Sequence, residues 1–96
     1  MDNFVIGTII KSIAGHDQQE VFIILRVEGE YVYLVNGKNR TLSKPKRKKI
    51  KHIVFVNTVN EKFIALLNNN QLLDSHIRTI IRNETKNIVE NDHVRV

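Results

Sequence analysis

The chain has 96 residues, of which 42% are hydrophobic, as expected for a single small globular domain and unlike a disordered segment. It has no cysteine, which excludes disulfides and thiolate metal sites. Its longest apolar run, Val21–Leu25, is far shorter than the roughly 20 residues that span a bilayer. Because Asp2 stands where a secretory signal carries positive charge, these features together predict a cytoplasmic protein without a membrane segment.

The formal net charge of +5 comes from one short stretch. From Lys38 to Lys51 there are eight basic residues and no acidic one, whereas the rest of the chain has seven basic and ten acidic residues. Crowded cations repel one another and gain nothing on folding, but they bind a polyanion by neutralising phosphates and releasing counterions. The stretch therefore predicts a phosphate-rich partner. The other interpretation is a solvated loop that only keeps the protein soluble.

The first part of the chain predicts a sheet of short strands. Apolar or alternating residues between turn signals indicate strands at residues 5–12, 20–28, 31–35, 41–43 and 53–58. Glu28-Gly29-Glu30 is typical of a tight turn, and Asn36-Gly37 of a type I′ hairpin. Five short strands joined by tight loops predict a closed barrel, because closure removes exposed strand edges.

The predicted strand at residues 20–28 is apolar on both faces. Val21 and Ile23 share one face, and Phe22 and Ile24 lie on the other. Phe22 and Ile24 would be out of place in water, so we expect the C-terminal helices to cover them.

After residue 58 the apolar period changes from that of a strand to that of a helix. Thr58 and Glu61 match a capping box, and the asparagines at 68–70 end the first helix. Asp74 is the expected N-cap of a second helix. Beyond Glu84 the pattern weakens to a frayed tail or a short strand. We thus expect one domain, 1–96, with a barrel at 4–58, a helical pair at 59–84 and a tail at 85–96.

Two further features are candidate contacts. Gly15 lets the backbone approach a phosphate, with nearby amides and His16 as donors. The alternative is an ordinary turn in which Asp17 caps its own backbone. Tyr31 and Tyr33 share one strand face, where they either stack on bases or cover the barrel edge or the helices.

No enzyme signature is found in the sequence. Asp74-Ser75-His76 has the residue types of a catalytic triad, but adjacent helix residues point in different directions. The four histidines lack the spacing of metal ligands, and the four glycines form no phosphate-binding fingerprint. We therefore expect neither catalysis nor a metal nor another cofactor.

Three segments together resemble a known family. Residues 7–17, followed by Val21–Ile24, look like a KOW motif. The run Lys44-Pro45-Lys46-Arg47-Lys48, ending in Lys51-His52-Ile53, resembles bacterial KOW-domain RNA-binding proteins, which are similar to a KOW-type large-subunit ribosomal protein of archaea and eukaryotes. The segment 74–78 also resembles the start of that family's last helix. The KOW turn usually has a second glycine after its aspartate, where Gln19 stands here, so we expect the lysine run to contribute more of the binding.

The resemblance implies a five-stranded SH3-like barrel with a C-terminal helical pair, and an RNA partner, ribosomal RNA or the large ribosomal subunit in particular. We expect non-catalytic binding of structured RNA, as in a ribonucleoprotein, through a lysine-rich loop at 44–52 and the KOW-like turn. The expected contacts are Lys38, Arg40, Lys44, Lys46, Arg47, Lys48, Lys49 and Lys51, with Gly15, His16 and Asp17 as a second contact. The alternatives are a protein-interaction module that docks an acidic protein, and a helix-turn-helix at 63–82 that reads DNA.

Overall fold

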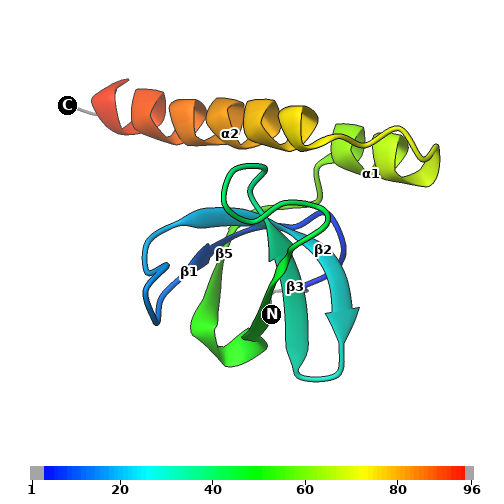
Figure 1. Cartoon of the computed structure of the whole chain (residues 1–96). Helices are drawn as coiled ribbons and strands as arrows, with labels where there is room; N and C mark the ends of the chain where they lie inside the picture. The colour runs from blue at the N-terminus through cyan, green and yellow to red at the C-terminus, as the bar shows by residue number, and fades with distance from the viewer. Residues whose placement is uncertain (1–3, 95–96) are drawn as a thin grey trace.

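The computed structural model describes residues 4–94 of the chain, and side chains up to residue 86. In this range five strands are followed by two helices, which lie together on one side of the sheet (Figure 1). The strands are β1 (Ile9–Ser12), β2 (Val21–Glu28), β3 (Tyr31–Val35), β4 (Lys46–Lys49) and β5 (Ile53–Asn57). The helices are α1 (Glu61–Asn68) and α2 (Asp74–Val94), and a 3-10 turn, Ile50–His52, joins β4 to β5. The predicted order, strands first and a helical pair last, is confirmed.

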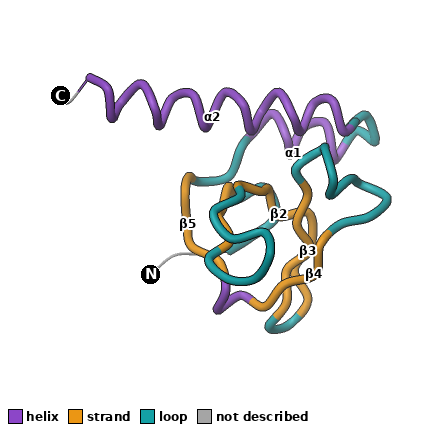
Figure 2. The backbone as a smooth tube through the Cα atoms, turned by 60° about the vertical axis from the view of Figure 1, so that its left-hand side comes forward, coloured by secondary structure: helices purple, strands orange, loops and turns teal. Residues whose placement is uncertain are grey.

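The sheet is antiparallel throughout, in the order β4-β3-β2-β1-β5. Within the described residues β4 and β5 each pair with one neighbour, so hydrogen bonds do not close the expected barrel. Shifts of register at Ile9/Ile10 and Ile24/Arg26 help to bend the strands. The sheet therefore curls, and Val32 of β3 shares a buried cluster with Ile53 of β5. Figure 2 shows β5 and β4 at opposite sides of this curl, beneath the helices.

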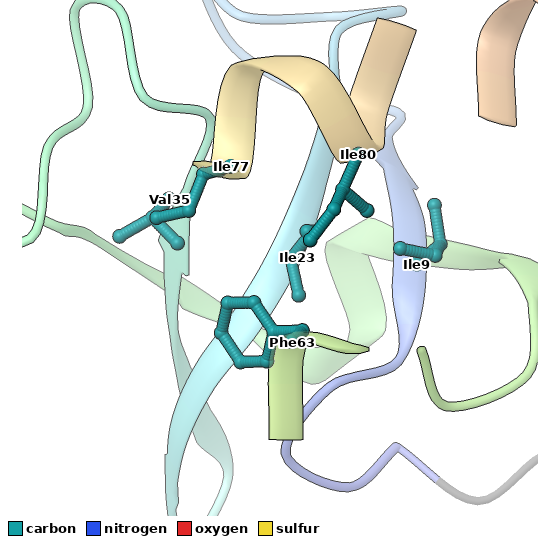
Figure 3. Close-up of a cluster of buried hydrophobic side chains, with 6 residues drawn as sticks. All are labelled: Ile9, Ile23, Val35, Phe63, Ile77 and Ile80. Carbon is teal, nitrogen blue, oxygen red and sulfur yellow. The ribbon is translucent and has the colours of Figure 1, made fainter. Parts of the chain in front are cut away.

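The two faces of β2 belong to two separate cores. The outer core joins the sheet to the helices and contains Ile9, Ile23, Val35, Phe63, Ile77 and Ile80 (Figure 3). Phe22 and Ile24 lie in the inner core, within the curl of the sheet. The expectation that the helices cover Phe22 and Ile24 is therefore wrong, since they cover the face of Ile23. Alternation predicts that both faces are buried, but it does not indicate which face is concave.

The basic run forms a strand rather than the loop that we expected. β4 pairs with β3 from Tyr31 opposite Lys49 to Leu34 opposite Lys46. All four residues of β4 are cationic, so the alternation of apolar and polar residues that indicates a strand is missing. The predicted strand at 41–43 is instead part of a turn, in which the Lys44 amide donates to the Thr41 carbonyl (3.0 Å).

The other strand predictions agree more closely with the structure. The predicted strands 20–28, 31–35 and 53–58 match β2, β3 and β5 to within one residue, and only the end of 5–12 is a strand. Gly29-Glu30 forms the expected two-residue turn between β2 and β3. Asn36-Gly37 does not form a two-residue hairpin, because the next strand begins only at Lys46.

Both helices begin close to their predicted starts, but the side-chain hydrogen bonds at these starts differ from those expected. Asn60 caps α1, since its Oδ1 accepts a hydrogen bond from the Phe63 amide (2.9 Å), so the predicted capping box of Thr58 and Glu61 is wrong. Asp74 is the first residue of α2, and its Oδ1 accepts a hydrogen bond from the Leu42 amide (2.9 Å). The carboxylate of Asp74 thus binds the loop that contains Leu42, which is far from it in the sequence.

The ends of the helices differ in how well the sequence predicts them. α1 ends in the run of asparagines as expected, with Asn70 at a φ of 57°. α2 instead continues to Val94, through most of the expected tail at 85–96, and residues 95 and 96 lie outside the described range. Over the residues that are described, neither helix has both the length and the apolar character of a membrane span.

The connection between β3 and β4, residues 36–45, is fastened to the start of α2. Within it, Asn36 Oδ1 accepts hydrogen bonds from the amides of Lys38 (2.9 Å) and Arg40 (3.0 Å). Arg78 Nη1 on α2 donates to the Gly37 carbonyl (2.6 Å). Gly37 has a φ of 79°, and a Cβ atom there would overlap the carbonyl oxygen of Asp74. The position therefore requires glycine for its backbone conformation and for space.

We expect Gly37→Ala to lower the free energy of unfolding by about 2–5 kcal/mol, because a left-handed backbone costs roughly 1–2 kcal/mol and overpacking roughly 1–3 kcal/mol. Urea unfolding of the purified variant measures the loss. Gly29→Ala is the matched control, since Gly29 has a φ of 59° but no atom lies within 4 Å of an added Cβ. It should lose only about 1 kcal/mol. Equal losses in the two variants would contradict the close docking of the loop on α2.

Candidate nucleic-acid interface

A buried lysine joins the two segments that the sequence analysis singled out. Lys48, on β4, is only 8% exposed, and its ammonium forms an ion pair with Asp17 in the turn between β1 and β2. The same Nζ donates to Ser12 Oγ (2.9 Å) and to the Ala14 carbonyl (2.8 Å). The three N–H groups of the ammonium therefore have three acceptors. Lys48 positions β4 against the turn and has no N–H group left for a phosphate.

The carboxylate of Asp17 is held in its charged form. Its Oδ1 accepts hydrogen bonds from Lys48 and from Ser12 Oγ (2.8 Å). Burial alone raises the pKa of Asp17, but the hydrogen bonds from Lys48 and Ser12 and the charges of Lys48 and Lys46 outweigh it, so the pKa lies below its ordinary value of 3.8. Asp17 is thus an internal partner of Lys48 rather than a cap of its own backbone, and its side chain is only 11% exposed.

The turn at residues 13–20 is held in a defined shape by its backbone. The Gln19 amide donates to the Ser12 carbonyl (2.8 Å), and the Glu20 amide donates to the Asp17 carbonyl (3.0 Å). Gly15 has a φ of 84°, and Gln19 a φ of 76°. Gln19 therefore adopts the left-handed conformation usual for glycine, although it is not a glycine. His16 and Gly15 are exposed at the tip of the turn.

The outward face of β2, β3 and β4 combines cations with aromatic rings. The guanidinium of Arg47 lies 3.6 Å from the ring centre of Tyr31, and that of Arg26 lies 4.0 Å from the ring centre of Tyr33. Lys49 Nζ is 5.9 Å from the ring centre of Tyr31. These are distances of cation–π pairs. The two tyrosines thus carry cations on the outer face of the sheet, and Arg26 is a member of this group that sequence reasoning missed.

The basic side chains of β4 other than Lys48 have no carboxylate partner among the described residues. The ion pairs found there are Lys48–Asp17 and Arg26–Glu28. Arg47 and Lys49 are exposed, and Lys46 is half-buried. Their charge is consequently available to an anion from outside the chain.

The remaining predicted contacts lie at two separate places. Lys38, Arg40 and Lys44 belong to the loop at 36–45, which is fastened to α2. Lys51 lies in the 3-10 turn and lines a small hollow beside Gly29. In the described range, no group of three histidine, aspartate or glutamate side chains is arranged to hold a metal ion. The chemistry that these residues offer is the binding of an extended anion, with flat guanidinium–tyrosine pairs next to it.

Comparison of the chain with models of known protein families and with curated proteins finds no match.

Removing the buried ammonium should destabilise the protein strongly. We expect Lys48→Met to lower the free energy of unfolding by about 3–5 kcal/mol, because Asp17 is then left as a buried charge without a partner. The side chains of the pair are only 7% and 11% exposed, so solvent does not replace the lost contact. Lys49→Met, the same change at the exposed next position of β4, should stay within about 0.5 kcal/mol of wild type.

A second change separates lost charge pairing from lost packing. Asp17→Asn added to Lys48→Met removes the unpaired charge, so the double variant should be more stable than Lys48→Met alone. Because the pKa of Asp17 is depressed in the folded state, its contribution is present above pH 3.8 and is lost as the pH falls further. The double variant should therefore lose less stability in acid than wild type. A Lys48→Met variant as stable as Lys49→Met would rule out the buried pair.

Proposed function

We propose that the protein binds structured RNA, without catalysis, through the outward face of β4 and the turn at 13–20. The observation that carries this proposal is the group formed by Arg47, Lys49 and Tyr31, in which two cations without a carboxylate partner among the described residues lie on or beside one aromatic ring. Exposed cations bind the phosphate backbone of any RNA, and flat guanidinium–tyrosine pairs offer surfaces on which an unpaired base stacks.

Shape supplies the selectivity in this proposal. Lysine and arginine contacts to phosphates carry no base information, so recognition depends on where the contacts lie relative to one another. The ion pair of Lys48 with Asp17 holds β4 and the tip of the turn, Gly15 and His16, at a fixed separation. A folded RNA whose two backbone segments have this same separation contacts β4 and the turn at once. A flexible single strand loses conformational entropy when it adopts the same spacing, so it binds more weakly.

The finer assignments rest on the resemblance to KOW-domain proteins. We propose that the curled sheet belongs to the SH3-like barrels, that the partner is ribosomal RNA or the large ribosomal subunit, and that the protein acts in the cytoplasm. In support, the inner core joins Val32 and Leu34 of β3 to Ile53 of β5, three strands further along the sheet, as the curl of a small barrel would. Gln19 has the backbone conformation of the glycine that it replaces, so the turn is compatible with the KOW motif.

The alternatives are less well supported. A helix-turn-helix reads DNA with the first turns of its second helix, but Arg78, the arginine in the first turns of α2, donates to the Gly37 carbonyl and helps to hold the loop. An acidic protein partner would satisfy the cations of β4 but gives no role to the paired tyrosines. A further alternative involves no ligand. Lysines on an edge strand prevent it from pairing with the sheet of another molecule, and this protection would by itself explain the charge of β4.

Affinity for a short RNA hairpin should fall as the salt concentration rises. The slope of this fall on logarithmic axes is set by the number of phosphates that the protein contacts. With about four to six contacts, the slope of log affinity against log salt should be roughly −3 to −5. Each of Lys46→Gln, Arg47→Gln and Lys49→Gln should reduce the magnitude of the slope by about 0.7–0.9, and the triple variant by about 2–3. Fluorescence anisotropy over a salt series measures these slopes.

Lys62→Gln is the control for loss of one positive charge, since Lys62 is exposed on α1, away from β4. It should keep the wild-type slope. The triple variant should also keep its melting temperature, because relief of repulsion offsets any lost contact. If the triple variant binds RNA as wild type does but self-associates, the charges protect the sheet edge and the proposal fails.

A further inference from the structure

A second basic surface lies between the helices and the sheet. A groove of about 790 Å³ runs between α2, the start of β2 and the loop at 36–45. Four basic residues line it, against one carboxylate, that of Glu20: Lys38, Arg82, Lys86 and Arg78, of which Arg78 donates to the Gly37 carbonyl. Arg82 and Lys86 are one turn of α2 apart, so their side chains follow the same side of the helix with a rise of about 6 Å between them. The groove therefore presents a row of cations to whatever occupies it.

The floor of the groove is apolar. Val21 of β2 and Ile81 of α2 line it and are only half-buried. A cationic rim above an apolar floor suits a ligand that has both charge and flat apolar surface. Unpaired nucleotides have both, since their phosphates bind lysine and arginine while their bases lie on apolar side chains or guanidinium planes.

The groove is continuous with the proposed RNA surface through the turn at 13–20. Gln19 and Glu20, at one end of this turn, line the groove, and Ala14 and Asp17, earlier in the turn, bind Lys48 of β4. One RNA chain is therefore able to pass from β4 across the turn to α2. Paired RNA presents a wide surface to β4, whereas the hollow beneath α2 admits a single strand.

We propose that this groove binds a single-stranded segment that flanks the paired region of the RNA. The inference rests on the proposed function, because it extends the same RNA beyond β4. Four cations against one carboxylate make the groove complementary to a phosphate chain, and the half-buried Val21 and Ile81 are the surface for its bases.

The test compares a blunt RNA hairpin with the same hairpin carrying an oligoadenosine tail of about four nucleotides, placed at either end. In wild-type protein one of the tails should raise the affinity about tenfold at roughly 0.1 M salt. Arg82→Gln with Lys86→Gln should abolish this gain while leaving the affinity for the blunt hairpin unchanged. Lys62→Gln should keep the gain. The triple variant of β4 should weaken both hairpins and keep the ratio between them.

The outcomes separate this inference from the proposed function. If wild type binds neither hairpin, the proposed function fails. If it binds the blunt hairpin but no tail adds affinity, the groove is not a nucleotide site. If oligoglutamate binds wild type, leaves hairpin binding intact and loses its affinity in the Arg82→Gln, Lys86→Gln variant, the groove takes an acidic protein segment instead, and the inference is overturned.

Discussion

The ion pair between Lys48 and Asp17 is the constraint on which the rest of the interface depends. The sheet is not closed by backbone hydrogen bonds, so β4 is an edge strand, which pairs with β3 alone among the described strands. Lys48 provides a second attachment, because its ammonium reaches the end of β1 and the turn that follows it. A buried pair of this kind adds little net stability compared with apolar packing, but it specifies one arrangement of the two segments. That arrangement is what a rigid RNA surface recognises.

Arg47 and Lys49 of β4 point outward, whereas Lys46 and Lys48 lie on the other face of the strand, and this division follows from its pleat. Side chains alternate across a sheet, so the buried Lys48 places Arg47 and Lys49 on the opposite face, above the tyrosines of β3. The helices lie on the outer core and do not cover these cations. The loop at 36–45 is fastened to α2 by hydrogen bonds to the Gly37 carbonyl and from the Leu42 amide to Asp74. Lys38 of this loop therefore lines the groove together with Gln19 and Glu20, which end the turn at 13–20. The fold thus gathers basic residues that are distant in the sequence around the turn at 13–20.

Much of this could be predicted from the sequence, and the failures have physical causes. The concentration of charge marks residues 46–49 as a candidate binding segment. A run of four cations has no alternation of apolar and polar residues, so the sequence predicts neither that this segment is a strand nor that Lys48 is buried. Burial of a lysine depends on a partner, and Asp17 is distant in the sequence. The pattern of β2 indicated two buried faces, yet only the curl of the sheet decides that Phe22 points inward and Ile23 towards the helices. Arg82 and Lys86 were not recognised as a site because the groove exists only once α2 packs on β2.

The most direct test of the account is a titration of the isotope-labelled protein with the blunt RNA hairpin, followed by the chemical shifts of its backbone amides. Because Lys48 joins β4 and the turn into one surface, the amides of Arg47 and Lys49 and those of Gly15 and His16 should shift together, with one common midpoint. The amide of Lys62 on α1 should not shift. Shifts confined to α1 and β5, or different midpoints for β4 and the turn, would contradict a single RNA-binding surface held together by the buried pair.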